Sequence, residues 1–259
     1  MAIDFFDPKD IQRLYDAEDE QVRAYVARLK NKIERFLNKI SAEIEKAGSG
    51  QKLNDLVASL SQLSAANLPK EVSSQLNEVT KLYQNRINTL EESFKIVSKA
   101  TQIFNPKDGQ IIGQIISYDK AQIVTTIEQT FNEFKQSAYK GSISGQLPNL
   151  RELSAAVSDS LESRLPSDLN TQLAAFQRTV SLQKAEDLGL NYFLYAGGLI
   201  KTSREFCIER AGKVFSVAEA KNWDNGQDLP VIPYLGGYNC RHTMVFMDLE
   251  KAKENGYKE

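Results

Sequence analysis

The spacing of apolar residues in the first part of the chain most constrains its fold. From about Asp7 to Ala47, apolar side chains recur at helical spacing, beginning with Ile11 and ending with Ile44. Asp7-Pro8 supplies an N-cap followed by proline at the first helical position, and Gly48-Ser49-Gly50 is a stop signal. At ~1.5 Å per residue this helix would be roughly 60 Å long. Such a length predicts an extended bundle or a helix that lies along a partner surface.

Helical patterns continue to Gly189, which closes the last of them. The predicted helices cover about 52–64, 69–100, 111–139, 149–163 and 167–188. Asn105–Gly109 has turn chemistry, Gly141–Gly145 is expected to be a loop, and Leu165-Pro166 is expected to separate the last two helices. Residues 1–189 are therefore predicted to form a helical scaffold or docking region with long extended helices.

The sequence changes character after Gly189. Strands are predicted at 191–196, 213–216 and 243–247, because these runs are short and contain aromatic and β-branched residues. Glycines also lie next to the first two runs. Ser216 and Glu219 form a capping-box pattern that opens a short helix reaching about Trp223. A loop at 224–237 and a final helix at 248–255 complete the segment. The fold class is thus mainly α, with residues 190–259 forming a small α+β module.

Composition excludes some classes of function. A net charge of −2 over 259 residues gives no overall attraction to nucleic acid or anionic lipid. No run approaches ~18 apolar residues, so no membrane span is expected. The first residues lack the basic and apolar regions of a signal peptide, so the chain is expected in the cytoplasm where it is made.

The residues with the strongest chemistry all lie in the predicted module. Cys207, Cys240 and the only histidine, His242, are three good zinc ligands. Cys240 and His242 can lie on one side of an extended segment, because side chains alternate along a strand. A fourth Cys or His is missing, and the remaining candidates are water or the carboxylates Asp224, Asp228 and Glu209.

The same residues allow two other interpretations. Cysteine and histidine can act as nucleophile and base, and Cys207 with His242 is the better pair because such residues usually come from separate segments. Alternatively, the cysteines are small buried residues and His242 bonds to the backbone.

The neighbouring residues carry predictions of their own. Gly236-Gly237 is expected to form a turn with positive φ. Arg204, Arg210 and Arg241 are expected to pair with Glu205, Glu209 and Asp228 or to hold an anion.

The run from Leu169 to Phe246 resembles the C-terminal region of phage minor head proteins, the Mu F-like head morphogenesis family. The shared elements occur in the same order along almost a third of the chain. They are Tyr195-Ala196-Gly197-Gly198, Ser203-Arg204-Glu205-Phe206-Cys207, Gly212–Ser216, Trp223 and Gly236-Gly237-Tyr238-Asn239-Cys240-Arg241-His242. Family members often have proline at the position of Glu205, and many have Cys-Arg-Cys where this chain has Cys240-Arg241-His242.

The resemblance implies a structural virion protein and not an enzyme. Such a minor capsid protein would be present in multiple copies at the portal vertex or capsid interior, and in the host cytoplasm during assembly. Its partners would be the portal protein, the major capsid protein or both, together with packaged DNA, and its role would be head morphogenesis and DNA packaging or ejection. The resemblance also favours zinc at Cys207, Cys240 and His242. The alternatives are a Cys–His hydrolase or transferase and a DNA-binding accessory protein.

Overall fold

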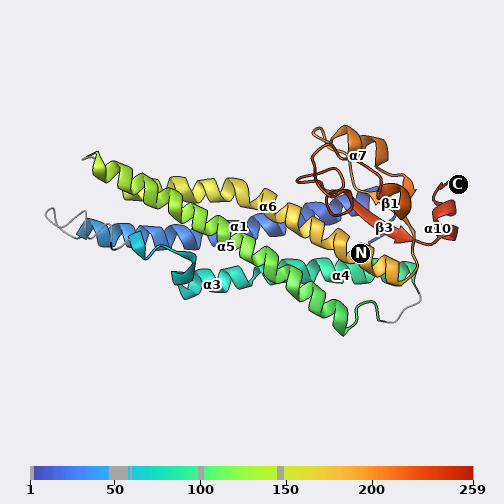
Figure 1. The fold of residues 1–259 in the computed structure, drawn as a ribbon, viewed down its shortest axis with the longest axis horizontal. Coiled ribbons are helices and arrows are strands. Elements are labelled where there is room, and N and C mark those ends of the chain that lie inside the picture. Colours follow the sequence, from blue (N-terminus) through green and yellow to red (C-terminus); the bar gives the residue numbers. More distant parts are fainter. Residues whose placement is uncertain (1–2, 47–57, 59, 99–101, 145–148, 259) are drawn as a thin grey trace. The chain divides into compact units, whose positions relative to one another are not determined.

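A computed structural model describes residues 3–46, 58, 60–98, 102–144 and 149–258. The chain is mainly α-helical with a small α+β module near its C-terminus, as the sequence predicts (Figure 1). The longer helices are α1 (Pro8–Lys46), α3 (Lys70–Asn77), α4 (Val79–Val97), α5 (Pro106–Ile143) and α6 (Leu150–Asp187), with a short 3-10 helix η1 (Ala65–Asn67). The module contains β1 (Tyr192–Ala196), α7 (Glu205–Arg210), β2 (Val214–Ser216), α8 (Val217–Ala220), α9 (Val231–Tyr234), β3 (Thr243–Met247) and α10 (Leu249–Glu254).

The first helix confirms the prediction made from its apolar spacing. α1 begins at Pro8, and the Asp7 carboxylate accepts a hydrogen bond of 2.8 Å from the Lys9 amide. This bond satisfies one of the amides that a helix leaves unpaired at its start. The predicted stop at Gly48–Gly50, and most of the helix predicted at 52–64, lie outside the described residues.

Asn105–Gly109 was predicted as a turn, and this prediction is wrong. Asn105 is the N-cap of α5: its side chain accepts bonds from the amides of Lys107 and Asp108, and the Asp108 carboxylate accepts one from the Asn105 amide. This reciprocal arrangement starts the helix at Pro106, five residues earlier than predicted. The opposite end of α5 reaches Ile143, inside the stretch predicted as a loop.

The predicted break at Leu165-Pro166 is also wrong, because α6 continues through the proline. Leu161, Leu165, Leu169 and Leu173 recur at four-residue spacing across Pro166, and all four are buried. Proline costs one hydrogen bond inside a helix. Here the burial of a continuous leucine row offsets that loss. The predicted helix at 69–100 shows the opposite behaviour, since a turn at Glu78 divides it into α3 and α4.

The module is built on a three-stranded antiparallel sheet in the order β2-β1-β3. Its three strands confirm the prediction within one residue, and Ser216 caps α8 by accepting a 3.1 Å bond from the Glu219 amide. α8 ends at Ala220, before the predicted Trp223. α7 was not predicted as a helix, and α9 lies inside the predicted loop.

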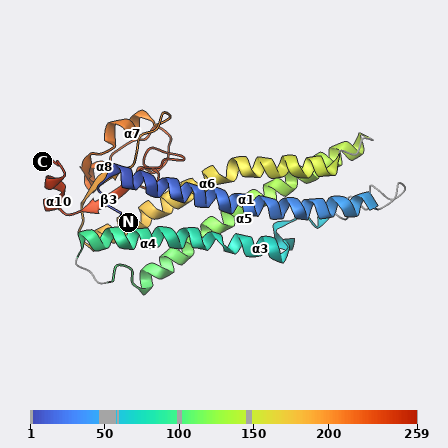
Figure 2. The same ribbon diagram turned by 180° about the vertical axis from the view of Figure 1, so that it is seen from behind.

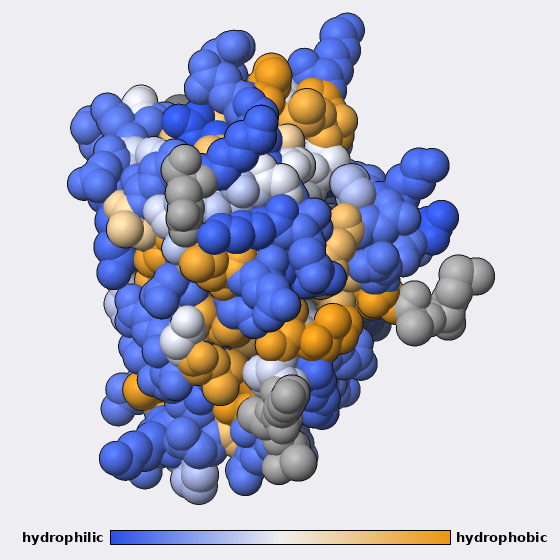
Figure 3. All heavy atoms as spheres, turned by 90° about the vertical axis from the view of Figure 1, so that its right-hand side faces the viewer, coloured by the Kyte–Doolittle hydropathy of each residue, from blue (hydrophilic) through white to orange (hydrophobic). Residues whose placement is uncertain are grey.

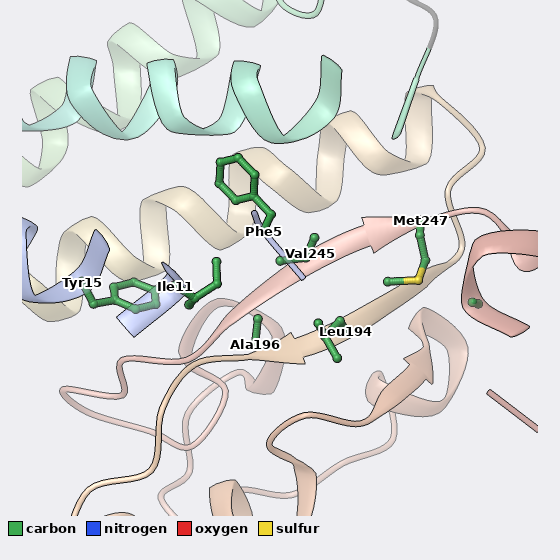
Figure 4. Close-up of a cluster of buried hydrophobic side chains, with 8 residues drawn as sticks. Phe5, Ile11, Tyr15, Leu194, Ala196, Val245 and Met247 are labelled. Atoms are coloured by element: carbon green, nitrogen blue, oxygen red, sulfur yellow. The ribbon is translucent and has the colours of Figure 1, made fainter. Parts of the chain in front are cut away.

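The chain divides into two compact units that do not follow chain order. The first unit comprises Met1–Gln21, Lys81–Ile116 and Asp168–Glu259, so the module shares it with the chain's first residues. Phe5, Ile11 and Tyr15 are buried against Leu194 and Val245 of the sheet (Figure 4). The strands also lie beside the C-terminal part of α6 in both ribbon views (Figures 1 and 2).

The second unit comprises Val22–Thr80 and Ser117–Ser167. It is held by apolar contacts between helices, such as the edge-on contact of Phe36 with Phe131, whose ring centroids are 6.0 Å apart. Its ion pairs lie nearer the surface, for example Arg164 with Glu133 at 3.0 Å. No helix in the described ranges combines the length and apolar character that a membrane span requires.

Candidate metal centre

The structure brings together the three predicted ligands Cys207, Cys240 and His242. The two sulfur atoms are 3.8 Å apart, and Cys240 Sγ is 3.7 Å from His242 Nδ1. All three side chains are buried, and one ligand atom from each lies within 4.8 Å of the others. Cys207 comes from α7, whereas Cys240 and His242 come from the segment that leads into β3.

The helix α7 explains how Cys207 reaches residues more than thirty positions away. The Arg204 carbonyl accepts bonds of 2.9 and 3.0 Å from the amides of Cys207 and Ile208, which starts the helix directly before the cysteine. Tyr195, at the end of β1, donates a 3.3 Å hydrogen bond from its hydroxyl to Cys207 Sγ. The sheet and α7 therefore converge on the same sulfur atom.

Two motif glycines are required by close approach to the cluster. A Cβ at Gly236 would lie 2.2 Å from Cys207 Sγ and 3.4 Å from Cys240 Sγ. A Cβ at Gly197, where φ is +136°, would lie 2.9 Å from the His242 ring. Such contacts are too short for any side chain. The predicted Gly-Gly turn has positive φ at Gly237 only, where φ is +97°.

Arg178 fixes the backbone on which two ligands lie, and it is not among the site residues predicted from the sequence. Its guanidinium donates to the carbonyls of His242 (2.9 and 2.6 Å), Cys240 (2.5 Å) and Pro233 (2.8 Å). The residue is 2% exposed, and these hydrogen bonds all go to backbone carbonyls. A sequence signal exists, because Arg178 lies at helical spacing between Ala174 and Ala185 on a buried face.

The remaining motif residues lie around the same cluster. Asn239 has φ of +55°, and its amide donates a 2.9 Å bond to Thr171 Oγ1. Gly198 faces Gln12, and a Cβ there would lie 2.2 Å from its Oε1 atom.

The predicted arginine pairings are confirmed only in part. Arg210 pairs with Glu209 at 3.0 Å as predicted. Arg241 pairs with Asp19 in α1, and Arg204 donates a 2.9 Å bond to the Tyr238 carbonyl. Arg241 and Arg204 therefore contact groups that are distant in sequence, and not the carboxylates that were expected.

Hydrogen bonding makes the two cysteines unequal. Their mutual hydrogen bond, together with burial, raises the pKa of Cys207, whereas the same bond lowers the pKa of Cys240 against the effect of burial. The His242 ring and the charge of Arg178 also lower the pKa of Cys240. Burial raises the pKa of Tyr195, so its hydroxyl stays protonated and remains a donor. The arrangement favours a thiolate at Cys240, which is the form that binds metals.

Two of the three separations between ligand atoms fit a tetrahedral metal ion, and the third is at most 4.8 Å. Two sulfur ligands at ~2.3 Å from zinc in tetrahedral geometry lie about 3.8 Å apart, and a sulfur and a nitrogen ligand lie about 3.6 Å apart. The observed separations are 3.8 and 3.7 Å. A metal at this position would bind His242 through Nδ1, the ring nitrogen that faces Cys240. The other ring nitrogen, Nε2, is buried without a hydrogen-bond partner among the described residues. Such an unpaired atom is costly, and a metal at Nδ1 does not satisfy it.

No fourth protein ligand from the predicted set joins the group. Among the described residues, the cluster contains Cys207, Cys240 and His242 but not Asp224, Asp228 or Glu209. Asp224 instead accepts a bond from the Gly226 amide, and Glu209 pairs with Arg210. The three ligands border a hollow of about 370 Å³, and Tyr195 is not among the residues that line it.

Comparisons of the chain with family models, with curated proteins and with solved structures gave no match.

Proposed function

We propose that this chain is a structural protein of a phage virion, a minor capsid protein associated with the portal or the capsid interior that acts in head morphogenesis and in DNA packaging or ejection. The observation that supports the proposal is the use of the shared motif. Gly197, Gly236, Arg204, Asn239 and Arg241 all pack or bond around one buried cluster. A motif whose residues serve packing is typical of a structural module.

The surface also supports contact with partners. Large apolar side chains that are at least 42% exposed occur in the module at Leu199, Ile200, Ile208 and Tyr238. Hydrophobic side chains reach the surface between hydrophilic ones on the face drawn in Figure 3. Exposed apolar groups of this kind suit a protein that is covered in an assembly. The proposed partners are the portal protein, the major capsid protein and packaged DNA.

Mass spectrometry of purified particles tests this proposal. We expect peptides of the chain in particles at several copies each, and density for it at the portal vertex or inner capsid surface. Absence from intact particles would overturn the proposal. Retention on DNA that falls steeply with salt, without any presence in particles, would support the accessory DNA-binding protein instead.

We also propose that Cys207, Cys240 and His242 hold a zinc ion. Two thiolates, one imidazole and Zn²⁺ form a neutral centre, which removes the cost of burying thiolates without a counter-charge. Tyr195 would serve as an outer donor that orients Cys207. When bound, the ion would join α7 to the segment before β3 and so stabilise the module.

Metal analysis of the purified protein tests this second proposal. One zinc per chain is expected for the native protein, and a large loss of zinc for Cys207→Ser and His242→Ala. Ser203→Ala is a matched control, because Ser203 lines the hollow but is not a ligand. A metal-free native protein with an unchanged melting temperature after zinc addition would refute the zinc site.

One observation favours a Cys–His enzyme as the second candidate. Cys240 Sγ lies 3.7 Å from His242 Nδ1, and both residues border the hollow. This interpretation requires that Cys240→Ser abolish hydrolysis or group transfer while the melting temperature stays unchanged. If the substitution lowers the melting temperature and no turnover is found, the structural role is supported.

A further inference from the structure

The hollow beside the cluster contains the three proposed ligands in its wall. Cys207, Cys240 and His242 all line this space of about 370 Å³. Its volume is within the range of sites for small ligands. Tyr195 is not among the residues that line this space. Its hydroxyl oxygen donates to Cys207 Sγ and lies 4.0 Å from Cys240 Sγ. The cluster therefore has the tyrosine hydroxyl as one neighbour and the hollow as another.

A protein with only two cysteines and one histidine cannot close a four-ligand site from these residue types. Structural zinc sites use four protein ligands, whereas sites with three protein ligands keep one position for a molecule from outside. Among the described residues, no carboxylate joins the cluster. Because the Tyr195 hydroxyl donates to Cys207 Sγ, the fourth position is left to a ligand that enters through the hollow.

The charges around the hollow favour an anion. Arg204 and Arg241 line it, and none of the described residues in its lining is an aspartate or a glutamate. Arg241 is balanced by Asp19, but Arg204 bonds only to the Tyr238 carbonyl among the described residues. Arg178, which donates to the carbonyls of Cys240 and His242, adds a buried positive charge near the cluster. With a neutral zinc–dithiolate–imidazole centre, the surroundings keep a positive charge.

We infer that the hollow is a binding site for a carboxylate, one oxygen of which completes the coordination of the metal while Arg204 pairs with the anion. The inference rests on the zinc site proposed above. Asn239, Thr202 and Ser203 supply further polar groups at the wall. Two sources share this chemistry: a small free acid, and a carboxylate carried by another protein chain.

Cobalt substitution tests the inference directly. Co²⁺ prefers the same ligands as zinc, and its visible absorption reports changes in coordination. The full-length protein loaded with Co²⁺ would be titrated with acetate and, separately, with acetamide, which has nearly the same shape but no charge. We expect acetate to change the cobalt bands with saturation and acetamide to leave them unchanged.

A pair of variants locates the anion. Arg204→Gln should weaken acetate binding about two- to fivefold at low salt, because its charge is partly screened by solvent. Lys201→Gln is the matched control, since it removes a positive charge from the same loop but lies outside the lining of the hollow. Both variants should keep the native melting temperature and cobalt content. Equal weakening by both would overturn the role of Arg204.

The source of the carboxylate is tested with N-acetyl-glycyl-glycine and its C-terminal amide. Tighter binding of the free-acid peptide than of acetate assigns the site to a protein-borne carboxylate, and equal binding assigns it to a small acid. Cobalt bands that none of these ligands changes would show that the fourth position does not take a carboxylate, and would overturn this inference while leaving the metal site intact. Failure to bind cobalt or zinc would overturn both.

Discussion

The two compact units are stabilised by different kinds of contact. In the unit formed by Val22–Thr80 and Ser117–Ser167, apolar side chains such as Phe131 are buried between helices, and charges pair near the surface. In the other unit, a guanidinium, two thiols, a phenol and an imidazole are buried together beside the sheet. Buried polar groups must all be satisfied to avoid a large cost. The second arrangement is therefore the one that indicates a specific site.

Removing the Arg178 guanidinium should have the largest effect. Arg178→Met leaves the buried carbonyls of Cys240 and His242, and the partly buried carbonyl of Pro233, without their donor. We therefore expect a loss of about 4–5 kcal/mol in the free energy of unfolding, measured with urea. Arg178→Lys keeps the charge but can bond to fewer carbonyls, so its free energy of unfolding should fall by less than that of Arg178→Met. If Arg178→Met lowers the free energy of unfolding by no more than a surface substitution does, the bonds from Arg178 to the three carbonyls are not needed for stability.

Truncation in the apolar unit should have a slightly smaller effect. Phe131→Ala removes a ring that is 0% exposed and contacts Phe36, and should cost about 3–4 kcal/mol in urea unfolding. Zinc content should stay at the native value, because Phe131 belongs to the other unit. Phe131→Leu is the milder comparison. Zinc loss in either folded variant would contradict the independence of the two regions.

Two glycine-to-alanine substitutions should change the stability of the protein in opposite directions. Gly236→Ala places a methyl group against Cys207 Sγ and should destabilise the protein by about 1–3 kcal/mol while lowering zinc content. Gly113→Ala, inside α5 with open space around it, should stabilise by roughly 0.5–1 kcal/mol because alanine favours helix. Thermal unfolding of both variants measures the contrast. Equal shifts of the melting temperature in the two variants would contradict the close packing at Gly236.

The smallest effect is expected at the surface of the helical unit. Glu133→Gln breaks the pair with Arg164, whose side chain is 50% exposed, and should change the free energy of unfolding by less than about 1 kcal/mol. Raising the salt concentration should reduce this difference further. A change comparable to that of Arg178→Met would show that surface charges matter as much as the buried cluster.

Local chemistry predicted much of the fold. The apolar spacing of α1, the cap at Asp7 and the three aromatic or β-branched strands depend on neighbours in sequence, and all were predicted correctly. Prediction failed where tertiary contacts override a local signal. Burial of Leu165 and Leu169 carries α6 through Pro166. The turn predicted at Asn105–Gly109 failed for a local reason instead, because Asn105 and Asp108 bond to each other's amides and start a helix.

The sequence by itself determined which residues carry the chemistry, because the chain has only two cysteines and one histidine and they fall in one short region. Only the tertiary structure decided that these side chains meet, since α7 must bring Cys207 to residues that follow it by more than thirty positions. It also decided that Arg178 and Tyr195 support them. Hydrogen bonds between distant segments depend on packing, and no spacing along the chain specifies them.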